Sequence, residues 1–414
     1  MLFGIAALAF LLLLYAVTAE RLNRWSISMP LIFVAGGLVL NRLGVFPLTP
    51  KYEGIKELTE ITLALLLFAD ASTLDLWQVG RDAGLPARLL LIGLPLMLLL
   101  GALLSAGLFP AEGLAAAALL GAILAPTDAA LGLPIFNNLN VPVRIRRALN
   151  VESGLNDGIA TPLVVFFIAL AVGEYEPQSR WLLSAATQIG LAVIVGSLTG
   201  LGGGWLLTQT ERHKWTTEIS EQLAILGLSL AAYFTSLAVG GNGFIAAFVA
   251  GIVFGAATRD RFAKSTELTE NNGSFLSVIV WTIFGAILVP IAVSGTADLR
   301  PIVYAVLSLT VIRMISVALA LKGTGLRRDT VLLMGWFGPR GLASVVFTLL
   351  ALLNFEEAQR SSDTLVVVAT WSIMLSVLAH GLSAGPLSRW YARRLEAAQT
   401  GHVALEELAE TREA

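Results

Sequence analysis

The chain has no cysteine among its 414 residues, only three histidines and few charged side chains. The lack of cysteine excludes disulfide bonds, thiolate metal sites and thiol chemistry. Charged residues make up 14% of the sequence, against about 25% in an average soluble domain. The 27 basic and 29 acidic residues nearly balance, so the chain lacks the basic excess typical of nucleic-acid binders. We expect no nucleic-acid partner and no cofactor.

Apolar residues are abundant: 56% of the chain is hydrophobic and its mean hydropathy is +0.78. A bilayer core about 30 Å thick requires about 20 apolar residues in each helix that crosses it. The sequence therefore predicts an all-α polytopic membrane protein with about thirteen transmembrane helices. The first is read as a span because it lacks the basic start and cleavage site of a signal peptide. The predicted spans are 1–19, 28–46, 55–79, 88–108, 112–136, 148–172, 181–208, 222–239, 243–258, 273–292, 300–321, 329–353 and 363–385.

Basic residues are distributed unevenly between the two sides that these spans define. Most of the 27 lysines and arginines fall on one side, and cytoplasmic loops are the ones that carry such an excess. An odd number of spans places the chain ends on opposite sides. The pattern predicts a protein of the cell membrane with its N-terminus outside, and with a short cytoplasmic tail at residues 395–414.

Two spans are interrupted at corresponding places. Pro126 falls within the fifth span and residues 338–341 fall within the twelfth. Corresponding breaks in two halves of a transporter indicate an inverted repeat. We expect two inverted six-helix repeats with discontinuous crossing helices, at about 1–172 and 222–385, joined by a linker helix at about 181–208. The alternative is that proline and glycine only kink these helices, as often happens in membranes.

Acidic residues occupy the fifth and sixth spans, at Asp128, Glu152 and Asp157. A carboxylate at the bilayer centre costs about 2.5–3.5 kcal/mol on insertion scales, so such residues mark ion paths or ion pairs. Ser153 and Asp157 are four residues apart and share one helix face, on which Asp157 can look toward the break at Thr127 and Asp128. Oxygen ligands of this kind suit an alkali cation. The alternative for Asp157 is a carboxylate that serves packing alone.

Glu152 and Asn156 share the next face of the sixth span, away from Ser153 and Asp157. The basic residues inside predicted spans are Arg313 and Arg340. A buried unpaired charge is costly, so an acid and a base at this depth are expected to pair. The sequence favours a structural ion pair between Glu152 and Arg313. It leaves Arg340 to neutralise the carbonyl ends that the twelfth-span break exposes.

Taken together, these segments resemble a known family over about residues 1–390. They are Leu67-Phe68-Ala69-Asp70 with Leu74-Asp75, Ala125-Pro126-Thr127-Asp128, Glu152-Ser153-Gly154-Leu155-Asn156-Asp157-Gly158, Arg313, and Gly338-Pro339-Arg340-Gly341. The chain resembles the sodium/proton antiporters of the NhaP and sodium/proton exchanger type, in the monovalent cation/proton antiporter-1 family. The resemblance extends to a transmembrane domain at residues 1–394.

The resemblance implies a role for each residue of the site. Asp157 would carry the cation or the proton, while Thr127, Asp128 and Ser153 complete the coordination. Asn156 would be a structural member, and the asparagine-aspartate pair marks the group that exchanges one cation for one proton without net charge. Glu152 and Arg313 match the family's stabilising ion pair. Asp70 matches an acidic position that reaches the site in some relatives.

The family also implies an architecture and a mechanism. A core domain of spans 3–5 and 10–12, with spans 6 and 13, would move against a dimerisation domain formed largely by spans 1, 2, 7 and 8 in a homodimer within the lipid bilayer. Na⁺ is the first expectation for the cation, with Li⁺ and K⁺ as alternatives. Because proton and cation compete for one site, transport is expected to slow at both low and high pH. This makes the chain a secondary transporter and not an enzyme.

Two rival functions remain open from the sequence. A sodium-coupled organic solute transporter of related inverted-repeat fold would use a similar crossing. The two acids, Asp128 and Asp157, disfavour binding of an organic anion in the site. A cation channel would need a continuous pore with weak, multi-site binding.

Overall fold

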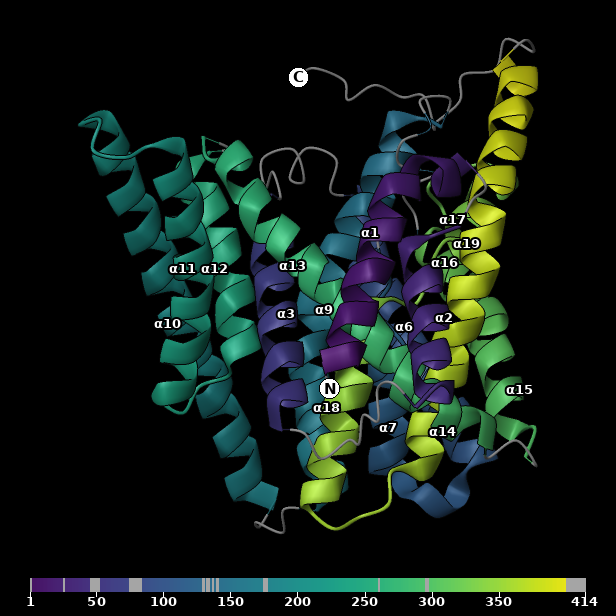
Figure 1. The fold of residues 1–414 in the computed structure, drawn as a ribbon. Helices are drawn as coiled ribbons and strands as arrows, with labels where there is room; N and C mark the ends of the chain where they lie inside the picture. The colour runs from purple at the N-terminus through teal and green to yellow at the C-terminus, as the bar shows by residue number, and fades with distance from the viewer. Residues whose placement is uncertain are drawn as a thin grey trace. The chain divides into compact units, whose positions relative to one another are not determined.

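The fold is described from a computed structural model, for residues 2–24, 27–44, 53–73, 84–128, 131, 135, 138, 141–173, 178–259, 261–294 and 298–399. All regular secondary structure in these residues is helical (Figure 1), which confirms the predicted all-α class. Within the same residues, eight helices are long and apolar enough to cross a membrane. Shorter apolar helices cover Met29–Arg42, Pro110–Ile123 and Gly243–Thr258. A helix lies within every predicted span, but the number thirteen remains a prediction.

The chain divides into two compact units. Unit 1 comprises residues 1–52, 82–156 and 278–414, and unit 2 comprises 53–81 and 157–277. The boundaries fall inside two long helices, α9 (Val143–Val172) and α13 (Ala263–Ile283).

Unit 1 contains the first part of α9, the last part of α13 and most of the shorter helices. Its other elements are α1 (Leu2–Arg24), α2 (Met29–Arg42), α5 (Gly84–Arg88), η1 (Leu89–Gly93), α6 (Leu94–Leu108), η2 (Pro110–Glu112), α7 (Gly113–Ile123), η4 (Phe284–Leu288), α14 (Val289–Ser294), α15 (Arg300–Leu307), η5 (Ser308–Ile312), α16 (Arg313–Ala320), α17 (Arg328–Trp336), α18 (Leu342–Glu357) and α19 (Asp363–Gln399). Figure 1 shows α1 and α19 running in the same direction across the unit.

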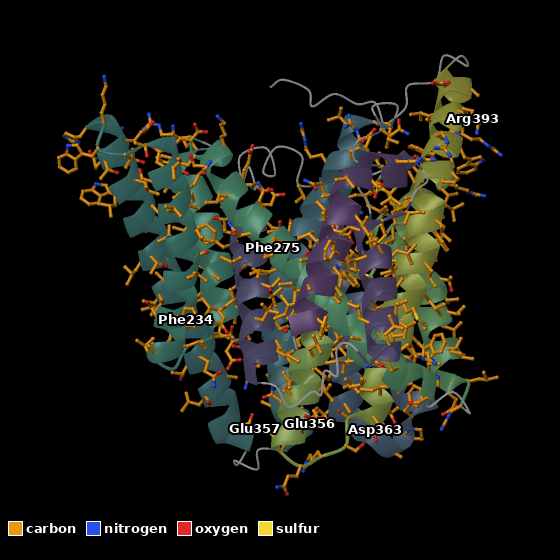
Figure 2. All side chains as sticks on the ribbon, in the orientation of Figure 1. Phe234, Phe275, Glu356, Glu357, Asp363 and Arg393 are labelled. Atoms are coloured by element: carbon orange, nitrogen blue, oxygen red, sulfur yellow. The ribbon has the colours of Figure 1, made fainter. Side chains whose placement is uncertain are left out.

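Charged side chains in unit 1 gather at helix ends. Glu356 and Glu357 close α18, Asp363 opens α19, and Arg393 lies near the far end of α19 (Figure 2). With 37 residues, α19 is about 55 Å long, well over the thickness of a bilayer core.

Unit 2 contains the second part of α9, the first part of α13, and the helices α3 (Glu53–Ser72), α10 (Gln178–Arg212), α11 (Glu218–Ala238) and α12 (Gly243–Thr258). Local signals set its helix ends. Thr217 and Ser220 form a capping box at the start of α11, and the Asn242 side chain accepts a hydrogen bond from the Ile245 amide at 3.0 Å to start α12.

Glycines let the helices of unit 2 pack with their backbones close together. A methyl group on Gly200 of α10 would lie 2.6 Å from the Ala250 carbonyl oxygen of α12. On the other side of α12, methyl groups on Gly251 and Gly255 would overlap the carbonyl oxygens of Phe68 and Ser72 in α3. Small residues at such contacts are the usual means of close packing between membrane helices.

The helices are grouped differently from the architecture that the family resemblance implied. Spans 1 and 2 were expected in a dimerisation domain and span 3 in the core, whereas α1 and α2 belong to unit 1 and α3 to unit 2. Glycine contacts explain both placements. Gly37 of α2 faces the Thr282 carbonyl and Gly285 of η4 faces the Val34 carbonyl, while α3 packs on α12 as described above.

Three helices of unit 1 contain a wide π-helical turn, at η1, η4 and η5. A π turn leaves backbone carbonyls without their usual partner, and such turns often occur at functional sites. In η4 the carbonyl of Ala286 accepts a hydrogen bond from Asn41 Nδ2 of α2 at 2.7 Å. A polar side chain from a neighbouring helix thus stabilises this turn.

Replacing Gly200 with valine is expected to destabilise the protein, because the new side chain must displace the Ala250 backbone. Overpacking of this kind costs about 1–3 kcal/mol. Thermal unfolding in detergent measures the loss. Gly202→Val is the matched control, since a Cβ on Gly202, two residues along α10, would meet nothing within 4 Å. Equal melting temperatures for the two variants would contradict the close contact.

Candidate functional site

The two predicted breaks lie side by side in unit 1. The fifth span stops being helical after Ile123, at the end of α7, and its chain continues in non-helical form through Asp128. The twelfth span is interrupted between Trp336, the last residue of α17, and Leu342, the first of α18. The Asp128 amide donates a hydrogen bond to the Pro339 carbonyl at 2.9 Å. The two interrupted segments therefore cross in direct backbone contact.

Arg340 neutralises the carbonyl end of α7. Its Nη1 donates to the carbonyl oxygens of Ala125 at 3.2 Å and Pro126 at 3.3 Å, and the side chain is 1% exposed. The C-terminal end of a helix carries a partial negative charge and orphaned carbonyls. The arginine thus acts on the carbonyls of the other break. The sequence assigned Arg340 to the carbonyls of its own break, where Nη1 lies 3.4 Å from the Gly338 carbonyl, but it did not predict the two shorter contacts to the fifth span.

Asp128 compensates the amide end of a helix, at the start of α18. Its Oδ2 accepts a hydrogen bond from the Leu342 amide at 2.9 Å, at the N-terminus of α18, where free amides and a partial positive charge favour an acid. Gly341 makes room for this contact, because a Cβ there would overlap the Asp128 carboxylate. The carboxylate that was expected to bind a cation therefore also holds the start of α18.

Thr127, Ser153 and Asn156 form a buried polar cluster beside the crossing. Thr127 Oγ1 accepts a hydrogen bond from Asn156 Nδ2 at 2.7 Å and lies 3.3 Å from Ser153 Oγ. All three side chains are 8% exposed or less. The structure thus brings the hydroxyls of the fifth and sixth spans together. The role of Asn156 as a structural member of the site stays a prediction.

Asp157 and Asp70 belong to unit 2. Asp157 directly follows Asn156 on the continuous helix α9, one turn beyond Ser153, and its carbonyl accepts a hydrogen bond from Thr161 Oγ1 at 2.7 Å. Asp70 lies near the end of α3, and Thr73 Oγ1 donates to its carbonyl at 3.0 Å. Both aspartates are half-buried. Their roles as ligands remain predictions.

Glu152 and Arg313 form the expected ion pair. Arg313 Nη1 and Nη2 donate to the two carboxylate oxygens of Glu152 at 2.6 and 3.0 Å, and the side chains are 1% and 2% exposed. Arg313 Nη2 also donates to the Phe337 carbonyl at 3.3 Å, beyond the end of α17. A Cβ on Gly338 would overlap this guanidinium. The pair thus joins α9, α16 and the twelfth-span break.

A family model for the transmembrane sodium/hydrogen exchanger matches residues 6–390. The chain belongs to the sodium/hydrogen exchanger family. Two curated relatives are similar to this exchanger over different lengths. The K⁺/H⁺ antiporter NhaP2 of Shewanella oneidensis is 35% identical over 148 residues, which are 35% of this chain and 25% of that protein. The Na⁺/H⁺ antiporter ApNhaP of Aphanothece halophytica is 26% identical over 85% of this chain and 67% of its own length.

A solved structure has the same fold as this exchanger. The sodium proton antiporter MjNhaP1 of Methanocaldococcus jannaschii, determined at pH 8, superimposes with a TM-score of 0.76 at 20% sequence identity. The match covers 94% of this chain and 99% of that one. The family and the fold together make the exchanger a multi-pass membrane protein.

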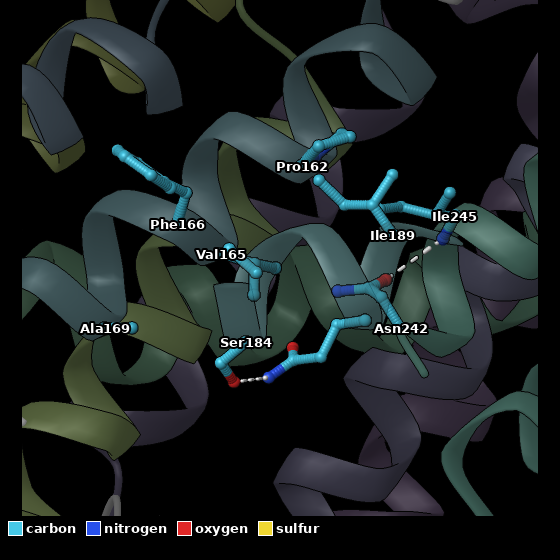
Figure 3. Close-up of a pocket in the computed structure, with 10 residues that line it drawn as sticks. Pro162, Val165, Phe166, Ala169, Ser184, Ile189, Asn242 and Ile245 are labelled. Carbon is cyan, nitrogen blue, oxygen red and sulfur yellow. Dashed lines mark hydrogen bonds between the residues drawn. The ribbon is translucent and has the colours of Figure 1, made fainter. Parts of the chain in front are cut away.

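The described part of the chain contains no cluster of three His, Asp or Glu side chains that could hold a metal ion. A cavity of about 70 Å³ lies within unit 2 beside Pro162, Phe166 and Asn242 (Figure 3). The two amide side chains that line it already have hydrogen-bond partners. Asn242 caps α12, and Gln188 Nε2 donates to Ser184 Oγ at 3.4 Å. The cavity lacks a charged lining residue.

Sequence reasoning missed three hydroxyl and imidazole groups that support the crossing. Ser344 Oγ donates to the Ile123 carbonyl at 2.8 Å, Ser376 Oγ accepts from the Arg340 amide at 2.6 Å, and His380 Nε2 lies 2.9 Å from the Trp336 carbonyl. A sequence signal exists for two of them. Ser372, Ser376 and His380 recur every four residues and mark one polar face on an otherwise apolar helix.

Arg313→Met is expected to destabilise this exchanger strongly, since it leaves Glu152 as an unpaired buried charge. Breaking one side of such a pair costs about 3–5 kcal/mol. The double variant Glu152→Gln/Arg313→Met should recover part of the loss, which a double-mutant cycle of thermal unfolding measures. Asp298→Asn, which breaks the exposed pair with Arg300, should leave the melting temperature unchanged. A similar loss in that control would argue against burial as the cause.

Gly341→Ala is expected to impair the site while leaving the packing of the remaining helices intact, because its methyl group must push the Asp128 carboxylate off the start of α18. Gly107→Ala is the control, since a Cβ on Gly107 of α6 meets nothing within 4 Å. Cation-dependent proton movement in proteoliposomes compares them. Equal activity in the two variants would show that the contact of Asp128 with α18 is dispensable.

Proposed function

We propose that the chain is a secondary antiporter that exchanges a monovalent cation for a proton, with Na⁺ as the first candidate and Li⁺ or K⁺ as alternatives. The observation that carries the proposal is the crossing of two interrupted helices, where the Asp128 carboxylate lies at the start of α18 and the hydroxyl of the preceding Thr127 lies 3.3 Å from Ser153 Oγ. The names of relatives support the same class, since one is a K⁺/H⁺ antiporter and another a Na⁺/H⁺ antiporter. No cofactor takes part, because the cation and the proton are the substrates.

The proposed mechanism assigns the transported charge to Asp157. Its carboxylate binds either a proton or a partly dehydrated cation, with Thr127, Asp128 and Ser153 as further ligands and with Asp70 as a neighbouring acid. A neutralised carboxylate crosses a region of low dielectric at lower cost than a charged one. Alternating access then exchanges one cation for one proton without net charge, as the pair Asn156 and Asp157 indicates through the family resemblance.

Arg340, Glu152 and Arg313 have supporting roles in this proposal. Arg340 compensates the partial negative charge at the C-terminal end of α7. No transported cation is needed to compensate that charge. Glu152 and Arg313 compensate each other's charge. The pair therefore adds no net charge to the site.

The setting of the protein is part of the same proposal. We place it in the cell membrane as a homodimer surrounded by lipid, with the N-terminus outside and residues 395–414 as a cytoplasmic tail. The parallel course of α1 and α19 and the basic end of α19 support this orientation. We retain the two repeats at about 1–172 and 222–385 and the linker helix at about 181–208 as proposals.

Proteoliposomes with an imposed proton gradient test the function. Wild-type protein should dissipate the gradient when Na⁺, Li⁺ or K⁺ is added, equally with the membrane potential clamped or free. Asp157→Asn should abolish this exchange, because an amide cannot carry the proton. Asp298→Asn, on an exposed loop, serves as the control variant.

Each other outcome points to a specific alternative. Dependence on the clamp would contradict the one-to-one exchange, and normal transport by Asp157→Asn would contradict the site. Sodium-driven uptake of labelled organic acids would favour the solute transporter, and single-channel currents would favour a channel.

A further inference from the structure

Three side chains of α19 contact the twelfth-span break, and the proposed mechanism uses none of them. The Arg340 amide donates to Ser376 Oγ at 2.6 Å. His380 Nε2 lies 2.9 Å from the carbonyl oxygen of Trp336, the last residue of α17. The indole of the same Trp336 donates to Ser383 Oγ at 2.9 Å. The helix α19 therefore binds both the end of α17 and the interrupted segment that follows it.

The end of α17 needs these contacts because its last carbonyls lack helical partners. Arg313 reaches the Phe337 carbonyl at 3.3 Å, and the Gly338 amide donates to the Trp336 carbonyl at 2.9 Å. His380 supplies a second donor to that oxygen, from a side chain that is 1% exposed. In a bilayer, water does not replace a lost donor at such a depth.

Both ring nitrogens of His380 lie near a carbonyl oxygen, and a carbonyl only accepts. Nδ1 lies 2.9 Å from the Ser376 carbonyl oxygen and 3.1 Å from Ser376 Oγ, and Nε2 lies 2.9 Å from the Trp336 carbonyl oxygen. Ser376 Oγ accepts the Arg340 amide, which leaves its own proton for Nδ1. A neutral ring that accepts this proton at Nδ1 carries its own proton on Nε2, and this tautomer places a donor at the Trp336 carbonyl.

We propose that His380 is a positioning residue for the cation site, acting through a hydrogen bond from its Nε2 to the Trp336 carbonyl. The inference rests on the proposed function of the crossing. The bond fixes the peptide chain that leaves α17, and three residues later that chain presents the Pro339 carbonyl to the Asp128 amide. Ser376 holds the other side of that same peptide group, because it accepts a hydrogen bond from the Arg340 amide. The position of Asp128 against α18 depends on both contacts.

Two substitutions of His380 separate its two nitrogens. In His380→Gln the side-chain amide reaches about the place of Nε2 and keeps a donor for the Trp336 carbonyl. In His380→Asn the shorter amide reaches about the place of Nδ1 and leaves that carbonyl without the bond. Both variants are polar and smaller than or similar in size to histidine, so each controls for the other.

The readout is the cation concentration that gives half-maximal proton exchange in proteoliposomes of the full-length protein. We expect His380→Gln to stay within about twofold of wild type and His380→Asn to rise by about tenfold, the factor that one lost buried hydrogen bond produces. The maximal rate should change less than this concentration, because the carrier residues are intact. Equal values for the two variants would overturn the proposal.

A second pair keeps the test decisive if the histidine variants are poorly folded. Ser376→Ala removes the acceptor of the Arg340 amide, whereas Ser372→Ala, one turn earlier on α19, removes a hydroxyl that donates to the Val368 carbonyl of its own helix at 2.8 Å. Both serines are 0% exposed. Ser376→Ala should raise the half-maximal cation concentration and speed hydrogen exchange of the Arg340 amide, and Ser372→Ala should do neither.

The outcomes distinguish the two proposals. If wild-type protein moves no protons with any alkali cation, the proposed function fails and the His380 test is not reached. If wild type transports and Ser376→Ala behaves like Ser372→Ala, the function stands and the positioning role is wrong.

Discussion

The crossing of two interrupted helices is the constraint on which the rest of unit 1 depends. Each interruption leaves backbone groups without partners, in an environment where water does not supply them. Each break supplies hydrogen-bond partners for the helix end at the other break. Arg340 from one break covers the carbonyl end of the other, and Asp128 covers the amide end that Arg340's own break creates. Neither helix end is satisfied without the other, so the two segments must fold against each other.

The ion pair of Glu152 and Arg313 extends this arrangement to the surrounding helices. Arg313 touches the residues that follow α17, and Glu152 is the neighbour of Ser153 on α9. The hydroxyl cluster and the twelfth-span break are therefore linked through one buried pair. Its two charges compensate each other, so the pair adds no net charge to the crossing.

Local sequence signals predicted much of this structure. Hydropathy located a helix in every expected span, proline and glycine located both breaks, and the scarcity of buried charge selected Arg313 as the partner of Glu152. Contacts that depend on backbone approach were beyond such reasoning. The placement of α3 against α12 rests on Gly251 and Gly255, whose effect appears only when two helices meet. The contact of Asp128 with the start of α18 also depends on how two segments meet. The local sequence does not indicate which helix start a carboxylate will contact.

The wide turn η5 ends at the residue directly before Arg313. A π turn accommodates one residue more than an α turn, and it behaves like a single insertion that the helix has absorbed. Each residue of an α-helix advances the side-chain direction by about 100°. The phase of α16 relative to α15 is thus set by this one surplus residue. Without the surplus residue, Arg313 would point about 100° away from its present direction, so the ion pair with Glu152 depends on the wide turn.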